Sequence, residues 1–289
     1  MSKQFNVNET AAGAGNSRAM EADTILKTRA SLKSHKGREN FLIKACFVLM
    51  TASIIFCGCG KDDEKDNGNG NGNGEEKTQL VKTITYHSGY VQTFEYDNQN
   101  RITKTTYYHN GTDYAFYTFE YNGDDLVKYV GQSPSGGQYT VDYSKSGNVI
   151  NVIETDSEGR SHVGTIELNS DGYPVAMSFE GSSYQETYQY FDGNMVKYSH
   201  GEGGSSSLTF QYDDKKSPFY NCKTPKWFFI ARQFFESYFT PIKNNATKMT
   251  AIYNDYTEEC EISYEYDDAG FATKMTYKGG DNFVFTFSY

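Results

Sequence analysis

The chain has 289 residues, of which 37% are hydrophobic and 16% aromatic, and its 37 acidic side chains outnumber the 27 basic ones for a net charge of −10. So acidic a protein repels phosphate backbones, which excludes nucleic acid from the expected partners. Residues 1–58 hold more basic than acidic side chains, so the remainder of the chain is more acidic still.

The first predicted element is an export signal near residue 50. Basic residues between Lys33 and Lys44 precede the apolar run 45–56, and the small residue Gly58 follows it. A basic region, a short apolar core and a small residue before the processing point are typical of a secretory signal. A membrane-spanning helix needs about 20 apolar residues, so a short transmembrane anchor or a buried helix is the less favoured alternative.

The end of this signal, Phe56-Cys57-Gly58-Cys59, resembles the lipobox of bacterial lipoproteins, although Phe56 and Cys57 depart from the usual aliphatic and small residues. In that family the last cysteine receives the lipid and becomes the mature N-terminus. The resemblance therefore implies that Cys59 carries fatty acyl chains such as palmitate. Lys61 and the acidic residues after it resemble the tag of surface-displayed lipoproteins of Bacteroidota, which implies an outer-membrane protein that faces the cell exterior.

These features divide the chain into three parts. Residues 1–58 form an N-terminal extension and lipoprotein signal peptide, and residues 59–77 form the lipidated cysteine and a flexible acidic and Asn-Gly tether. Gly-rich tethers behave as random coils, so residues 60–77 have a root-mean-square reach of about 23 Å, enough to hold a domain clear of a lipid surface. Residues 78–289 form the folded domain.

A short motif recurs through the folded domain. Thr93-Phe94-Glu95-Tyr96 alternates polar and aromatic residues and is followed by turn residues and a second alternating run, as in a β-hairpin. Related openings follow at a fixed period of 22 or 25 residues, at Thr118, Thr140, Thr165, Thr187 and Thr209. Similar segments begin near the C-terminus at Ile262 and Thr286.

This period predicts an all-β fold, a single curved antiparallel meander of about 16 strands built from repeated hairpins, either open or closed into a barrel. Alternation within each strand predicts one aromatic and one polar face. We expect Phe94 and Tyr96 on the same side of the sheet, with Thr93 and Glu95 on the other. Because so wide a sheet twists and curls, closure or another element must cover its aromatic face.

A candidate cover interrupts the repeats at about 218–246, where residues 224–241 have the pattern of one inserted amphipathic helix. Thr224 suits the N-cap, Pro225 the first turn and Pro241 the stop. A wide apolar stripe runs along this helix, formed by Trp227, Phe228, Ile230, Phe234, Phe235 and Tyr238. The helix is expected to pack on the sheet or to plug a barrel end. The alternative is an exposed aromatic helix that meets a membrane or a partner.

The hairpins resemble the Tyr-Asp (YD) repeat of the Rhs type, on Tyr96-Asp97 followed by Arg101-Ile102 and on YDDAGF at 266–271. Residues 80–289 are similar to a group of Bacteroidota surface lipoproteins of unknown function built from such hairpins, and residues 217–248 resemble that group's insert. Leu168 departs from the pattern because it replaces the repeat's tyrosine. The resemblance implies the fold, and it implies no reaction because none is established for the group.

No motif of a nucleotide-binding or nucleophile-based enzyme is present in the sequence. Four carboxylates occupy equivalent positions in successive repeats, namely Glu95, Glu120, Asp142 and Glu167. Paired carboxylates hydrolyse glycosides when their environments differ and one pKa is raised. A repeat gives its carboxylates like environments, so a solvated acidic ladder is the favoured interpretation. A carboxylate-based hydrolase on the sheet remains the alternative to a non-catalytic protein.

The sequence suggests no cofactor and no metal site. No two histidines lie at metal-ligand spacing among the four that follow the export signal, His87, His109, His162 and His200. A glycine shortly after three of them indicates turns. Cys222 and Cys260 can form a disulfide in an exported protein, or they can remain two separately buried thiols.

The favoured hypothesis is a lipid-anchored surface protein with a non-catalytic binding or structural role. Its contact surface is expected to be a polar face bordered by tyrosines, and the partner a glycan or a protein. Because aromatic rings stack on sugars, the candidate ligand contacts are Tyr96, Tyr121, Tyr143 and Trp227. An outer-membrane channel fits less well, because membrane strands need about 9 to 11 residues and an apolar outward band.

Overall fold

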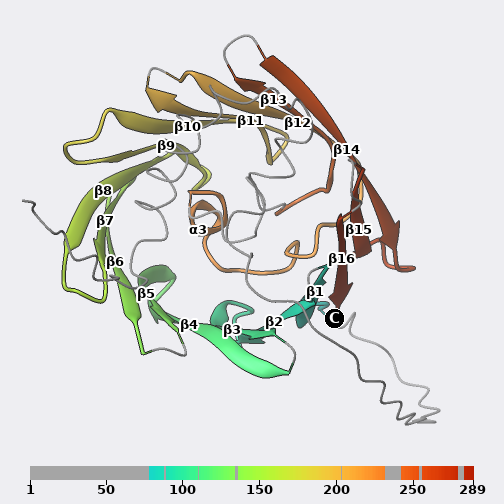
Figure 1. Cartoon of the computed structure of the whole chain (residues 1–289), viewed down its shortest axis with the longest axis horizontal. Coiled ribbons are helices and arrows are strands. Elements are labelled where there is room, and N and C mark those ends of the chain that lie inside the picture. Colours follow the sequence, from blue (N-terminus) through green and yellow to red (C-terminus); the bar gives the residue numbers. More distant parts are fainter. Residues whose placement is uncertain are drawn as a thin grey trace, which may run out of the picture.

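The computed structural model describes residues 78–87, 89–109, 111–133, 136–202, 204–231, 242–253, 256–278 and 283–289. The predicted export signal, Cys59 and the tether lie outside these residues, as does the part of the predicted helix that follows Ala231. Most of the described chain forms one β-structure (Figure 1).

Sixteen strands follow one another along the described chain. Their bounds are β1 (Thr83–Tyr86), β2 (Tyr90–Tyr96), β3 (Ile102–His109), β4 (Thr112–Asn122), β5 (Asp125–Gln132), β6 (Gln138–Ser146), β7 (Val149–Thr155), β8 (Ser161–Leu168), β9 (Pro174–Phe179), β10 (Tyr184–Phe191), β11 (Asn194–Glu202), β12 (Ser206–Tyr212), β13 (Ala246–Tyr253), β14 (Tyr256–Tyr266), β15 (Ala272–Lys278) and β16 (Phe283–Ser288).

The strands form a closed antiparallel barrel in which each strand pairs with its sequence neighbours and β1 pairs with β16 (Figure 1). The closing ladder places Ile84 opposite Phe287 and Tyr86 opposite Phe285. Closure removes the unpaired edges that an open sheet of this width would expose. The predicted all-β antiparallel meander is confirmed, and of its two forms the closed barrel is the one observed.

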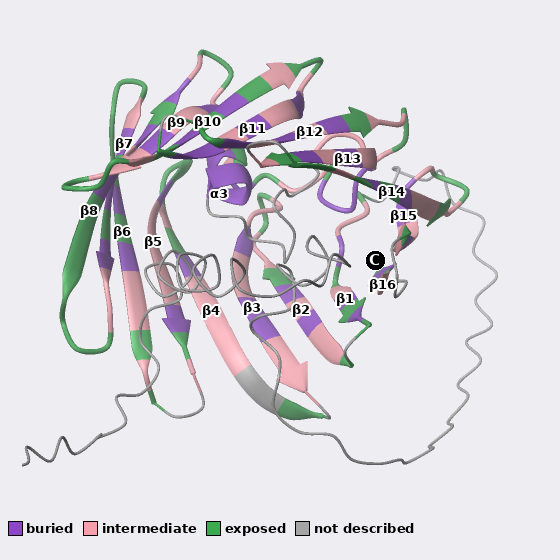
Figure 2. Cartoon of the chain, turned by 45° about the horizontal axis from the view of Figure 1, so that its top comes forward, coloured by how far each residue is buried: buried purple, intermediate pink, exposed green. Residues whose placement is uncertain are grey.

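The two faces of the barrel differ as the alternation predicts. Phe94 is 6% exposed and lies on the inner side with the partly buried Tyr96, whereas Glu95 between them is exposed. Figure 2 shows the same alternation of burial along many strands. On the outer face, charged side chains pair across neighbouring strands, as in Lys104–Glu95 (3.5 Å), Lys128–Asp142 (3.4 Å), Lys248–Glu259 (2.8 Å) and Lys274–Glu265 (2.8 Å).

In several repeats the tyrosine joins its hairpin to the chain segment before it. A β-bulge follows Glu95, and Tyr96 Oη then donates a hydrogen bond to the backbone oxygen of Val81 at 2.7 Å. The same bond recurs around the barrel in Tyr121–Ile102 (2.9 Å), Tyr190–Pro174 (2.6 Å), Tyr212–Met195 (2.6 Å) and Tyr289–Ala272 (2.7 Å). In β14 it is Tyr264, two residues before Tyr266, whose hydroxyl donates to a backbone oxygen, that of Ala246 at 3.0 Å. A tyrosine in this position buries its large apolar ring, and its hydroxyl donates a hydrogen bond to a backbone carbonyl.

The aspartate after the tyrosine closes the hairpin turn. Asp97 Oδ1 accepts hydrogen bonds from the backbone nitrogens of Gln99 and Arg101, each at 2.9 Å. Asn100 has a φ of 65°, a left-handed conformation that asparagine tolerates better than most residues. The turn that begins at Asp267 repeats this arrangement. The Tyr-Asp pair therefore combines an inter-strand bond with a turn.

The segment between β12 and β13, residues 213–245, is here called the insert. Asp213 begins it and Asn245 ends it, and Asp213 Oδ1 accepts a hydrogen bond from the backbone nitrogen of Asn245 at 3.0 Å. Tyr266 Oη of β14 donates to the other carboxylate oxygen of Asp213. We call this end of the barrel the insert end. The turns between β9 and β10 and between β11 and β12 lie at the opposite end.

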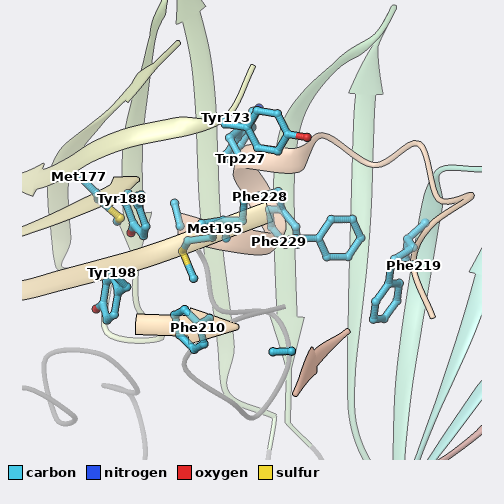
Figure 3. Packing of buried hydrophobic residues seen from close by; sticks show 14 of the residues in the cluster. Tyr173, Met177, Tyr188, Met195, Tyr198, Phe210, Phe219, Trp227, Phe228 and Phe229 are labelled. Atoms are coloured by element: carbon cyan, nitrogen blue, oxygen red, sulfur yellow. The ribbon is translucent and has the colours of Figure 1, made fainter. Parts of the chain in front are cut away.

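The insert carries the helix α3 (Lys226–Ala231), which lies inside the barrel (Figure 1). The ring of Phe228 lies 5.3 Å from those of both Phe119 and Tyr129, and Figure 3 shows Phe228 beside Trp227 and Phe229. In α3, all residues from Trp227 to Ala231 are buried. This part of the predicted helix therefore plugs the barrel, and the alternative of an exposed aromatic helix is wrong for residues 226–231.

Candidate functional site

A polar cleft of about 530 Å³ opens at the insert end. Three parts of the chain form it: the turn between β8 and β9, the turn between β10 and β11, and the start of α3. Its lining residues are Asn169, Asp171, Tyr173, Tyr190, Asp192, Gly193 and Lys226. Figure 3 shows that Tyr173 and Trp227 lie near each other, where this end of the barrel meets the helix.

Two tyrosine rings form the aromatic part of the cleft. The ring centroids of Tyr173 and Tyr190 are 4.8 Å apart. Tyr190 Oη donates to the backbone oxygen of Pro174, and burial raises the pKa of Tyr190, so its phenol stays neutral at physiological pH. Lys226 Nζ lies 3.0 Å from Tyr173 Oη and 4.3 Å from the centroid of that ring, within the range of a cation–π contact.

Two carboxylates and a second ammonium complete the polar part. Lys243 Nζ lies 2.7 Å from Asp192 Oδ1 and 2.8 Å from the backbone oxygen of the same residue. Asp171 lies in the turn in which Asn169 Oδ1 accepts hydrogen bonds from the backbone nitrogens of Asp171 and Tyr173, both at 3.0 Å. Lys243 pairs with Asp192 from beside the lining, so Lys243 and Lys226 together balance the formal charges of Asp171 and Asp192.

Gly193 keeps the cleft open. Its φ of 74° lies in the left-handed region, and a Cβ atom there would approach Lys243 Cδ to 3.1 Å and Tyr173 Oη to 3.3 Å. Any other residue would therefore strain the turn and crowd the lining.

The four predicted aromatic contacts lie elsewhere, inside the barrel. Tyr96 and Tyr121 are partly buried and their hydroxyls bond to backbone oxygens. Tyr143 and Trp227 are each 5% exposed and pack together with their centroids 4.9 Å apart. The aromatic side of each strand faces the lumen, so Tyr143 is enclosed there, whereas Tyr96 and Tyr121 keep part of their surface exposed. A ligand that contacted Tyr143 or Trp227 would have to enter the barrel.

The four ladder carboxylates are exposed on the outer face of the barrel, at Glu95, Glu120, Asp142 and Glu167. Lys104 and Lys128 pair with two of them. A glycosidase acid needs a desolvated environment, whereas these four side chains are exposed to solvent. The ladder is therefore a solvated surface feature, and it offers no support to the hydrolase alternative.

The histidine positions correct part of the turn interpretation. His200 lies in β11, is 8% exposed and faces the lumen, and His109 is the last residue of β3. Only His87 lies in a turn, and His162 is exposed in β8. The glycine after His200 suggested a turn, but Gly201 lies within β11, near its end, where its φ of 93° bends the strand. Among the described residues, no group of three or more His, Cys, Asp or Glu side chains is placed to hold a metal ion.

The two cysteines of the domain are free thiols, so the disulfide between Cys222 and Cys260 is absent and the alternative of separate thiols holds. Cys222 belongs to the insert and Cys260 to β14. Burial raises the pKa of each thiol to about 11.

Sequence reasoning missed the cleft because its residues come from two turns and the insert. One signal was present. Leu168 replaces the repeat's tyrosine, and the turn after it begins with Asn169 in place of aspartate and has Tyr173 where the first hairpin has Arg101. The departure from the repeat at residues 168–173 thus coincides with residues that line the cleft.

No protein-family model matches the chain, and no curated protein matches it. Among solved structures, a porin-like protein from Bacteroides uniformis ATCC 8492 aligns over 72% of this chain and 96% of its own, with 13% identity and a TM-score of 0.35. A porin-like protein from Bacteroides vulgatus ATCC 8482 aligns over 73% and 99%, with 12% identity and a TM-score of 0.39. Similarities this low carry no functional argument. In the described part of the chain, no helix has both the length and the hydrophobicity to cross a bilayer.

Proposed function

We propose that this protein is a lipid-anchored lipoprotein of the outer membrane, that it faces the cell exterior, and that it has a non-catalytic binding role for which a glycan is the ligand. The cleft at the insert end is the single observation that carries the binding role. It places two neighbouring tyrosine rings among carboxylate, amide and ammonium groups.

This combination suits a neutral saccharide. Sugar rings present C–H groups on their faces, which pack on aromatic rings, and hydroxyls at their edges, which bond to carboxylates and amides. The hydroxyls both donate and accept, so Asp171 can accept from them while Asn169 Nδ2 and Lys226 donate. Because the charges in the cleft balance, a neutral ligand is favoured over a polyanion or a polycation.

The outer face supports a barrel that stands clear of the bilayer. A membrane barrel presents an apolar band about 25 Å tall to the lipid. Here the outward side chains of β2, β3, β5 and β6 form ion pairs, as do those of β13, β14 and β15. Anchoring through the lipid on Cys59 is thus favoured over insertion of the strands.

The described domain begins at the insert end, because Asn221 Nδ2 of the insert donates to the backbone oxygen of Gln79 at 2.9 Å. A tether that ends at residue 77 therefore leads to the same end of the barrel as the cleft. Its reach of about 23 Å leaves space for a saccharide between the barrel and the lipid surface.

Calorimetric titration of the purified protein with a panel of neutral extracellular polysaccharides and their oligosaccharides tests the binding role. We expect saturable binding that falls about tenfold or more in Asp171→Ala, because a hydrogen bond to a charged group contributes about 1.5 to 3 kcal/mol. Glu167→Ala, which removes an exposed carboxylate from the outer face, is the matched control and should bind like the wild type. Absence of saccharide binding, or equal loss in both variants, would refute the proposal.

The anchoring is tested separately in cells. Cys59→Ala should move the protein from the outer-membrane fraction to the soluble fraction and remove the label of a radioactive fatty acid. Protease added to intact cells should cleave the wild type if it faces the exterior. Retention of Cys59→Ala in the membrane would contradict the anchor.

A further inference from the structure

A second polar cluster lies on the inner wall of the barrel, toward the end opposite the insert. Glu186 of β10 is 5% exposed and faces the lumen opposite His200 of β11. Tyr184 is the first residue of β10 and Tyr253 the last of β13, and both are only partly buried. The cluster is therefore near the rim of the barrel, away from the cleft.

The carboxylate of Glu186 is held by phenols rather than by a cation. Tyr188 Oη donates to Oε2, and Tyr184 Oη donates to Oε1 at 3.3 Å. Of the ion pairs found in the described residues, none includes Glu186. Burying an ionised carboxylate costs several kcal/mol unless a positive charge compensates it. The hydrogen bonds orient this carboxylate but leave its charge uncompensated.

Aromatic rings surround the same carboxylate. The ring centroids of Tyr188 and Tyr198 are 5.5 Å apart, that of Tyr198 is 5.1 Å from His200, and that of Tyr184 is 6.2 Å from His200. Figure 3 shows Tyr188 and Tyr198 facing the interior on neighbouring strands. Burial and then the charge of Glu186 raise the pKa of Tyr198, so this phenol stays neutral. Neutral phenol faces attract cations through their quadrupoles.

We propose that Glu186 and the tyrosines around it form a binding site for a small organic cation, an alkylammonium group that enters from the rim opposite the insert. The ammonium charge would compensate the buried carboxylate, and its alkyl groups would pack on the rings. This site lies apart from the saccharide cleft and binds a different class of ligand. Its test is therefore independent of the test of the function proposed above.

The imidazole of His200 is the rival source of positive charge, because it lies directly opposite Glu186 in the strand register. His200→Gln removes the imidazole and leaves Glu186 in place. Choline binding that persists in this variant separates an external cation from the imidazole.

The test is calorimetric titration of the purified protein with choline at pH 8 in 0.1 M salt, alongside 3,3-dimethylbutanol, the neutral isostere of choline. We expect saturable choline binding and about tenfold or more weaker binding of the isostere, because the isostere lacks the charge that the carboxylate and the ring faces attract. Glu186→Gln should lower choline affinity about tenfold or more. Glu167→Gln on the outer face loses the same charge and should bind choline normally.

Tyr184→Leu provides a second variant at the partly buried rim, and it should also weaken choline binding if Glu186→Gln does not fold. The melting temperature of each variant confirms that the barrel is intact. The proposal is overturned if choline gives no saturable binding, if the isostere binds equally well, or if folded variants at Glu186 and Tyr184 bind choline like the wild type.

Discussion

Phe228→Ala tests the structural role of the insert. Phe228 is 0% exposed, and its ring lies 5.3 Å from Phe119, 5.3 Å from Tyr129 and 6.1 Å from Trp227. Truncating a fully buried phenylalanine typically costs about 3 to 5 kcal/mol, from lost transfer free energy and from the cavity left behind. The six described residues of α3 are too few to form a stable helix by themselves, so its position depends on packing contacts such as this one.

The assay is urea unfolding followed by two probes. The chain has a single tryptophan, Trp227, whose fluorescence reports on α3, while far-ultraviolet circular dichroism reports on the barrel. We expect Phe228→Ala to lower the free energy of unfolding by about 3 kcal/mol or more, with the tryptophan transition at lower urea than the barrel transition. Phe191→Ala, which removes a ring that is 75% exposed, is the matched control and should change stability by less than about 0.5 kcal/mol. A cost below about 1 kcal/mol for Phe228→Ala, with both probes unchanged, would refute a packed insert.

Three further predictions concern the repeats and the thiols. Tyr212→Phe removes the hydroxyl that bonds to Met195 O at 2.6 Å and should cost about 1 kcal/mol in urea unfolding; a neutral or stabilising change would contradict the role given to this bond. Burial alone would raise the pKa of Asp97, but hydrogen bonds from Arg101 and Gln99 outweigh it and lower that pKa. Its stabilisation is therefore complete above the unfolded pKa of about 3.9 and is lost as pH falls through the folded value, so stability at pH 3 should fall less in Asp97→Asn than in the wild type. Cys222 and Cys260, with pKa values of about 11, should react slowly with a disulfide reagent at pH 8 in the native state and quickly in urea, and rapid native labelling of both would contradict their burial.

The fold was largely predictable because one short pattern determines it. Alternation in Thr93-Phe94-Glu95-Tyr96 sets which side chains face inward, and the turn residues that begin at Asp97 set the hairpin. Closure was not predictable in the same way. The pairing of β1 with β16 joins residues such as Ile84 and Phe287 across nearly the whole domain, and no local pattern specifies a contact so far apart in sequence.

The candidate sites were harder to predict because they depend on that closure. Asp171, Asp192 and Lys226 belong to two turns and the insert, and they meet only after the insert folds back into the lumen. The predicted contacts at Tyr96 and Tyr121 were chosen for chemistry that suits sugars, yet their hydroxyls serve the barrel itself. The residues that recur from repeat to repeat thus have structural roles, whereas the residue that breaks the repeat, Leu168, lies next to the cleft.

Covalent capture of the closing strands tests the central claim most directly. Thr85 of β1 and Thr286 of β16 are register partners on the outer face, so Thr85→Cys with Thr286→Cys should form a disulfide readily under mild oxidation. Thr85→Cys with Thr250→Cys places the second thiol on β13, three strands beyond β16, and is the control that should not react. Peptide mapping by mass spectrometry identifies the bond. The closed barrel predicts rapid, near-complete linkage of residues 85 and 286 alone, and linkage no faster than in the control would contradict it.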